Sequence, residues 1–247
     1  MRRDLGRKRS DGHAGIITAG FFGEPRPSTP LRERYNARVR FTTVFFDLDD
    51  TIYPASTGLW RAIKNRMNDY IRDRVGIPSA EIGALRERYF LEYGTTLRGL
   101  EAHHSVDSAD FLAYVHQLPL EEYLAPDPHQ RAVISALPVR KLIFTNADSA
   151  HAKRVLGMLN LEDCFDGIID VNALAPYCKP LPQSFEVAMR VAGEMRPSMC
   201  AIIDDLPRTT HAARQQGIYA ILFGRETAYP DADATLLDWA DLPARLG

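Results

Sequence analysis

Cysteine is scarce in this chain of 247 residues, which contains three. Cys164, Cys178 and Cys200 form no C-x-x-C pair, so their spacing excludes the usual zinc sites. An odd and widely spaced set also excludes the disulfide framework of a small secreted domain. We therefore expect reduced, buried thiols in a cytoplasmic protein.

Long hydrophobic runs and an excess of one charge are missing too. No stretch reaches the roughly 18 consecutive apolar residues that a membrane span requires. The 30 Lys and Arg nearly balance the 32 Asp and Glu, for a formal net charge of -2. Without a positive field, neither a nucleic-acid polymer nor an anionic membrane is expected as a partner. The sequence leaves the oligomeric state open.

Residues 1–40 also lack a repeating hydrophobic pattern. They are rich in Arg, Gly and Pro, and neither a helical nor a strand period persists. Such a segment has little apolar surface to bury, so we expect a disordered extension. Residues 15–22 are only weakly apolar and contain Thr and Gly, which makes a poor signal-peptide core, and no secretion is expected.

Beyond residue 40, five short apolar runs have the composition of buried strands. They are residues 41–47, 141–145, 167–171, 199–204 and 218–223, with helix-like segments at 149–159, 182–192 and 208–216. This alternation is typical of β-α-β units that build a parallel sheet. The prediction is an α/β fold with a doubly wound parallel-sheet (Rossmann-like) core, formed by residues 41–56 and 138–247.

The interval 57–137 interrupts this alternation. Apolar positions recur three and four residues apart from Leu59 to Val75 and from Ala80 to Tyr93, which predicts amphipathic helices. We expect a small all-helical cap domain, inserted after the first strand. Within it, YGTTLRGL at 93–100 is predicted to be a loop that faces the cleft, where Arg98 is a candidate substrate or phosphate ligand.

Three carboxylates follow the first predicted strand in the sequence FDLDDT, residues 46–51. Carboxylates crowded at a strand end repel one another, and a divalent cation compensates that repulsion. Mg²⁺ prefers a few carboxylate oxygens and keeps waters or phosphate oxygens in its other positions. Open α/β sheets also bind their ligands at this end of the strands. The acidic loop therefore predicts a magnesium site.

The ends of the other predicted strands carry complementary chemistry. Thr145 and Asn146 close the second run, Lys179 precedes a helix, and Asp204 and Asp205 close the fourth run. Because parallel strands end at one edge of a sheet, these residues come together there. They supply hydroxyl, amide and ammonium contacts to a phosphate, together with further metal ligands.

These motifs resemble those of the haloacid-dehalogenase-like hydrolase superfamily. Asp47-x-Asp49-x-Thr51 is similar to the first family motif, Thr145-Asn146 to the second, Lys179 to the third and Asp204-Asp205 to the fourth. The motifs occur in the family's order, and the helical insertion stands where the family carries a cap.

The resemblance implies a role for each residue. Asp47 is the nucleophile that forms an aspartyl-phosphate, and Asp49 is the general acid and base. Thr145, Asn146 and Lys179 bind the phosphoryl group. The implied Mg²⁺ ligands are Asp47, the backbone carbonyl of Asp49 and Asp205, with Asp204 as the alternative to Asp205.

A further resemblance, to the pyrimidine 5′-nucleotidase branch, rests on residues 47–58, 93–100 and 171–180. It implies nucleoside monophosphates such as UMP or CMP as substrates. An acid at Asp49 suits an oxygen leaving group, which favours a phosphomonoester over a carbon–halogen bond. A sugar-phosphate or phosphoglycolate phosphatase, a phosphomutase and a non-catalytic regulatory protein that retains the fold are the alternatives.

Overall fold

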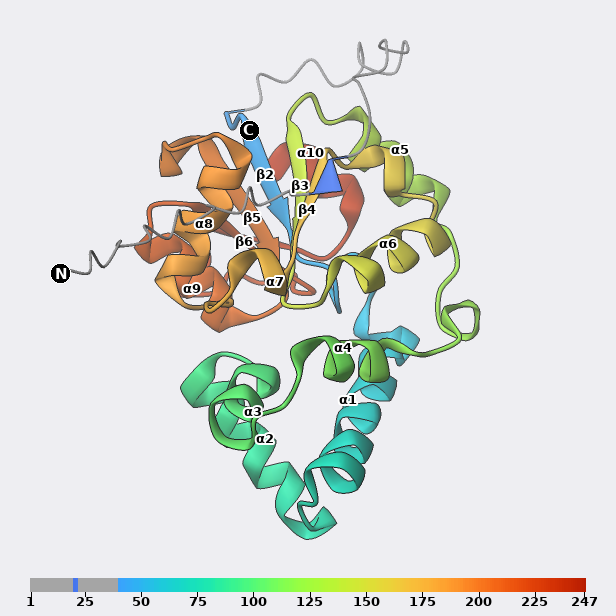
Figure 1. Cartoon of the computed structure of the whole chain (residues 1–247). Coiled ribbons are helices and arrows are strands. Elements are labelled where there is room, and N and C mark those ends of the chain that lie inside the picture. Colours follow the sequence, from blue (N-terminus) through green and yellow to red (C-terminus); the bar gives the residue numbers. More distant parts are fainter. Residues whose placement is uncertain (1–19, 22–39) are drawn as a thin grey trace, which may run out of the picture.

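The structure is a computed structural model, and it describes residues 20–21 and 40–247 (Figure 1). Residues 1–19 and 22–39 of the predicted extension, and the disorder predicted for them, lie outside the described part. Gly20–Phe21 form the two-residue strand β1, which pairs antiparallel with β4 (Gly167–Ile169).

A seven-stranded sheet in the order β1-β4-β3-β2-β5-β6-β7 forms the centre of the protein. The strands are β2 (Thr43–Phe46), β3 (Arg140–Phe144), β4, β5 (Cys200–Asp204), β6 (Tyr219–Phe223) and β7 (Ala234–Leu236), all parallel to one another. The five predicted strands are confirmed, and the predicted α/β fold with them. The sequence missed β7 because a strand of three residues is too short to show a pattern.

Helices cover both faces of the sheet (Figure 1). One face carries α5 (Pro128–Ala136), α6 (Ser149–Met158) and α10 (Leu242–Arg245), and the other carries α8 (Pro182–Ala192) and α9 (Pro207–Gln215). Successive residues of β2 point to opposite faces, so Val44 and Phe46 pack in the first layer and Phe45 in the second. Burial on both faces explains why these strands read as continuous apolar runs.

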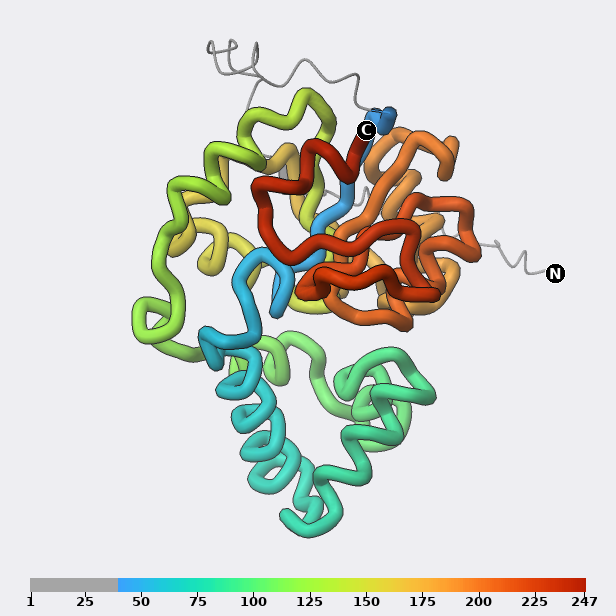
Figure 2. Tube along the Cα trace, turned by 180° about the vertical axis from the view of Figure 1, so that it is seen from behind, coloured from blue at the N-terminus to red at the C-terminus, as the bar shows by residue number. Residues whose placement is uncertain are grey.

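Of the remaining helices, the short α7 (Val171–Leu174) packs against α8, and four others form a separate lobe at the carboxyl ends of the strands (Figure 1). They are α1 (Leu59–Tyr70), continued by a π-helical turn at Ile71–Val75, α2 (Ser79–Tyr93), α3 (Thr96–His104) and α4 (Ser108–His116). α1 packs against α4, and α2 against α3. The chain enters this lobe after β2 and leaves it before α5 (Figure 2).

Two details differ from the sequence prediction for this region. The loop predicted across Tyr93–Leu100 is wrong, because α3 begins at Thr96 and only Gly94 and Thr95 separate it from α2. The side chain of Thr95 caps α3 by accepting a hydrogen bond from the N–H of Arg98. In addition, α5 packs beside the sheet, against the 3₁₀ helix Trp239–Asp241. The boundaries 57–137 of the cap stay a prediction.

Two expectations about composition can be compared with the structure. All three cysteines are free and buried. Among the helices of the described residues, none combines the length and the apolar character needed to cross a membrane.

Candidate active site

Asp47 and Lys179 form the centre of the site. Asp47 follows β2, and its N–H donates to the carbonyl of Ile203 at 2.9 Å, which extends the sheet ladder by one residue. Lys179 Nζ lies 2.6 Å from Asp47 Oδ1 and 2.6 Å from Asp204 Oδ2. Asp47, Asp204 and Lys179 are all buried, so the ammonium of Lys179 offsets the charge of both carboxylates away from water.

The protonation of this pair follows from burial and charge. Burial raises the pKa of Asp47 to about 7, against the lowering effect of Lys179, and the charge of Asp204 adds to the rise. Burial lowers the pKa of Lys179, but the charges of Asp204 and Asp47 outweigh it, and the net pKa lies above the usual range. Lys179 therefore stays protonated.

Asn146 holds Lys179 in place through the main chain. Its Nδ2 donates to the carbonyl of Lys179 at 3.0 Å, and the N–H of Lys179 donates to Asn146 Oδ1 at 2.9 Å. The donor and the acceptor of the Asn146 amide are thus both hydrogen-bonded to the main chain of Lys179. Direct contact of Asn146 with a phosphate stays a prediction.

Three carboxylates, from Asp47, Asp204 and Asp205, gather beside Lys179. Their oxygens lie within 4.8 Å of one another. Burial raises the pKa of Asp205 to about 8, and the charges of Asp47 and Asp204 raise it further. Crowded carboxylates with raised pKa values are suited to bind a hard cation, because the cation offsets their charge in place of the protons.

Within the pair at the end of β5, the two aspartates differ in what they contact. Both oxygens of Asp204 accept hydrogen bonds, from Lys179 Nζ and from the N–H of Leu206 at 2.9 Å. Asp205 Oδ1 accepts only a weak one, from the hydroxyl of Thr51 at 3.4 Å. The less occupied carboxylate, Asp205, is therefore better suited to bind a metal directly.

Asp49 is held by two hydrogen-bond partners, Tyr53 and His151. Tyr53 donates its hydroxyl to Asp49 Oδ1 at 2.5 Å, and His151 Nε2 lies 3.1 Å from the same oxygen. Burial raises the pKa of Asp49, but the charge and hydrogen bond of His151 and the hydrogen bond of Tyr53 lower it more, to a net value below the usual range. No motif in the sequence pointed to His151, which lies 102 residues from Asp49 along the chain.

Thr145 completes the polar end of the site. It follows β3 at the carboxyl edge, is buried, and accepts at Oγ1 a hydrogen bond of 3.0 Å from the N–H of Ala147. Asp47, Asp49, Asp205, Thr145 and Asn146 all line one cavity. The structure thus brings the sequence-predicted residues of four motifs to one place.

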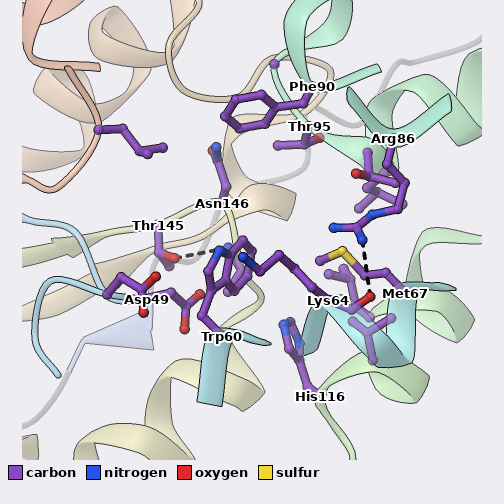
Figure 3. A pocket seen from close by; sticks show the side chains of 18 of the residues that line it. Asp49, Trp60, Lys64, Met67, Arg86, Phe90, Thr95, His116, Thr145 and Asn146 are labelled. Carbon is purple, nitrogen blue, oxygen red and sulfur yellow. Dashed lines mark hydrogen bonds between the residues drawn. The ribbon is translucent and has the colours of Figure 1, made fainter. Parts of the chain in front are cut away.

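This cavity, of about 430 Å³, lies between the sheet edge and the helices α1–α4 (Figure 3). That volume falls within the usual range for small-molecule sites. Its wall on the helical side is largely apolar, formed by Trp60, Met67, Phe90, Leu97, Phe111, Leu112 and Val115. Two cations of the same helices, Lys64 and Arg86, also line it, and the sequence reasoning missed both.

Residues 41–217 match the protein family described as haloacid dehalogenase-like hydrolase. The chain belongs to this family. The resemblance seen in its motifs is confirmed.

Among curated relatives of this hydrolase is Phosphate metabolism protein 8 of Saccharomyces cerevisiae, 31% identical over 190 residues. The match covers 70% of this chain and 59% of the yeast protein, so the chain spans less than two thirds of that relative's length.

Solved structures share the fold of this hydrolase. A predicted phosphoglycolate phosphatase from Haemophilus somnus superposes with a TM-score of 0.56 and 17% identity, covering 83% of this chain and 98% of the other. A 2-haloacid dehalogenase from Pseudomonas syringae gives 0.53 and 21%, with coverages of 83% and 98%. The same architecture thus occurs with two chemistries.

Arg98 is placed differently from the cavity-lining residues of the hydrolase. Its Nη2 donates to the carbonyl of Val171 at 2.7 Å, and its Nη1 pairs with Glu101 at 2.8 Å. The side chain is thus committed to a contact between α3 and the sheet domain, and it is not among the residues that line the cavity. A role in binding phosphate stays a prediction.

Arg208 makes the reciprocal contact. It extends from α9 and donates to the carbonyls of Phe90 and Gly94, both at 2.6 Å, with its guanidinium 3.2 Å from the centroid of the Phe90 ring. Gly94 has a φ of 84°, and a Cβ there would lie 2.7 Å from Cys178 Sγ. The α2–α3 junction is therefore pressed against the segment that carries Lys179.

Proposed function

We propose that this hydrolase is a Mg²⁺-dependent phosphatase that acts on nucleoside monophosphates through an aspartyl-phosphate on Asp47. The observation that carries the proposal is the contact of 2.6 Å between Lys179 Nζ and Asp47 Oδ1, beside the carboxylates of Asp204 and Asp205. A cation next to the nucleophile lets an anionic substrate approach a carboxylate. The yeast relative, whose printed name refers to phosphate metabolism, supports the same chemistry.

In the first step, a carboxylate oxygen of Asp47 attacks phosphorus, and the bond from phosphorus to the leaving oxygen breaks. Asp49 donates a proton to that oxygen. A substrate dianion close to Asp49 raises the pKa of its carboxyl, which favours the protonated form needed here. Lys179 balances the negative charge that gathers around Asp47.

In the second step, water attacks the phosphorus of the aspartyl-phosphate. Asp49, now ionised, accepts the proton of that water, and the bond between phosphorus and Asp47 breaks to release phosphate. Tyr53 and His151 hold the Asp49 carboxylate during the exchange of roles. Thr145 and Asn146 line the same cavity as Asp47 and would bind the transferring group there.

The residues present fit a Mg²⁺ ion held by Asp47, Asp205 and the backbone carbonyl of Asp49. A bound cation offsets charge on the phosphoryl oxygens during transfer.

Dehalogenation is the chemistry of one structural neighbour and is therefore an alternative reaction for this fold. Displacement of a halide requires no proton on the leaving group. The hydrogen bonds from Tyr53 and His151 to Asp49, and the three clustered carboxylates, are provisions for proton transfer and for a cation. They favour a phosphomonoester.

The test is phosphate release from UMP, CMP, AMP, ribose 5-phosphate and phosphoglycolate, with Mg²⁺ and with EDTA. We expect metal-dependent release, led by UMP and CMP. Asp47→Asn should lose roughly 10⁴-fold or more in turnover while keeping its melting temperature. Asp241→Asn, at an exposed carboxylate, is the matched control.

Other outcomes separate the alternatives. Release led by ribose 5-phosphate or phosphoglycolate keeps the mechanism and changes the substrate. Transfer of the phosphoryl group without stoichiometric phosphate indicates a mutase. Absence of release from every ester overturns the proposal in favour of a regulatory protein.

A further inference from the structure

Arg86, on α2, is half-buried, and the protein uses only part of the hydrogen-bonding capacity of its guanidinium. Its Nη1 donates to Asn68 Oδ1 at 2.7 Å and, less closely, to the carbonyl of Lys64 at 3.3 Å. Its Nε is buried and has no hydrogen-bond partner. Over residues 40–247, Arg86 takes part in no ion pair.

An arrangement of this kind is costly unless a ligand completes it. Burial lowers the pKa of Arg86, and no carboxylate offsets the loss of hydration. A buried donor without a partner has lost its hydration with no hydrogen bond in return, and the cost is larger when the donor is charged. A guanidinium has donors only, so the group that satisfies it is a hydrogen-bond acceptor.

The cavity has polar groups at opposite ends. Figure 3 shows Arg86 at the end away from Asp49 and Thr145, with Met67 beside it. Lys64 extends the other way, toward Asp49 and Thr145. Its charge also acts on the acidic loop, where it lowers the pKa of Asp50 against the larger effect of burial.

The groups around Arg86 restrict the kind of acceptor. Trp60, Met67 and Phe90 are flat or apolar, and they line the same cavity. Glu87 lines the same cavity next to Arg86, and its negative charge disfavours a second anion there. A neutral hydrogen-bond acceptor on a planar ring fits the surroundings of Arg86 best.

We infer that Arg86 is a specificity-determining residue, which donates a hydrogen bond to a base carbonyl of a pyrimidine nucleotide while the phosphoryl group lies at Asp47. The inference rests on the proposed function and adds the part of the substrate that the helical lobe recognises. UMP and CMP both carry a base carbonyl, whereas AMP and ribose 5-phosphate have none. The leaving group is thus selected far from the reacting phosphorus.

The experiment compares kcat/KM for UMP and CMP with kcat/KM for ribose 5-phosphate. A hydrogen bond from a charged donor is worth about 1.5–3 kcal/mol, so Arg86→Gln should lower this preference roughly tenfold to hundredfold. The change should lie mainly in KM. Calorimetric binding of uridine, which has no phosphate, should weaken by a similar factor, and this readout does not depend on turnover.

Two variants control for a structural role. Asn68→Ala removes the hydrogen bond of Arg86 to the Asn68 side chain but leaves the guanidinium, and it should keep the pyrimidine preference. Arg88→Gln changes an exposed arginine of the same helix that does not line the cavity, and it should leave all activities unchanged. Melting temperatures monitor folding.

The outcomes distinguish this inference from the proposed function. If Arg86→Gln slows every ester equally, or if Asn68→Ala also abolishes the preference, the inference is wrong and the phosphatase stands. If the wild-type protein binds uridine through Arg86 but hydrolyses no ester, the recognition site stands and the proposed function is wrong.

Discussion

The imidazole rings of His116 and His151 stack face to face, with centroids 4.0 Å apart and 13° between their planes. His116 ends α4, and His151 lies in the first turn of α6, so the pair connects the helical lobe to the sheet domain. Asp148 Oδ2 accepts from His116 Nδ1 at 2.6 Å, while His151 reaches Asp49. Burial and the charge of His151 lower the pKa of His116, which is therefore neutral at neutral pH.

Replacement of His151 by Phe should keep the stacked ring and remove its contact with Asp49. Since the charge and hydrogen bond of His151 lower the pKa of Asp49, that pKa should rise in the variant. Because Asp49 must be protonated in the first step, we expect the alkaline limb of the pH profile of kcat/KM to move to higher pH, with turnover reduced roughly tenfold or more. His129→Phe, at an exposed site, is the control. An unmoved alkaline limb would show that His151 does not act on Asp49.

Replacement of Lys179 by Met should destabilise the metal-free fold by roughly 3 kcal/mol, because it leaves two buried carboxylates without a counter-charge. Denaturant unfolding in EDTA measures the loss. The double variant Lys179→Met with Asp204→Asn should lose less than the sum of the two single changes, since it removes a charge together with its partner. Additive losses would contradict the ion-pair argument.

Metal-free protein should become less stable as pH rises between about pH 4 and pH 8. The pKa of Asp205 is raised by burial to about 8 and that of Asp47 to about 7, from an ordinary value of 3.8. In that range the folded state holds more protons than the unfolded chain, so the free energy of unfolding falls with pH, by up to ~1.4 kcal/mol per unit for each group. Mg²⁺ should remove most of the fall, because a cation replaces the protons.

The measurement is chemical unfolding in EDTA at several pH values, for the wild type and Asp205→Asn. His116 contributes a slope of opposite sign below its ordinary pKa of 6.5, so the difference between the two proteins is the quantity to compare. The variant should show the flatter fall. Identical slopes would mean that Asp205 is not protonated in the metal-free fold.

Two glycines of the helical lobe should respond to alanine in opposite directions. A Cβ at Gly99, on α3, would lie 2.1 Å from Cγ of Tyr89 on α2, and Gly99→Ala should cost roughly 1–3 kcal/mol in unfolding free energy. Gly83, on α2, faces open space, and Gly83→Ala should stabilise the helix by about 0.5–1 kcal/mol. Thermal unfolding checks both signs, and a neutral Gly99→Ala would show that α2 and α3 can separate at little cost.

The sheet and the proposed nucleophile could be predicted from the sequence because both are local in the chain. Strands buried on two faces appear as continuous apolar runs, and α8 is bounded by Pro182 and by Gly193 in the left-handed region. Asp47 and Asp49 are two residues apart after such a run. Local spacing therefore determined the fold class, the acidic loop and the motif residues.

Only the tertiary structure decided which residues surround these motif residues. His151 reaches Asp49 across 102 positions, and the amide of Asn146 is matched to the main chain of Lys179. A helical period shows which face of a helix is buried but not what that face meets, which is why Arg98 was expected at the cleft and Arg86 was not. Arg98 contacts the sheet domain and Arg86 lines the cavity because packing between α2, α3 and the core sets the direction of each side chain.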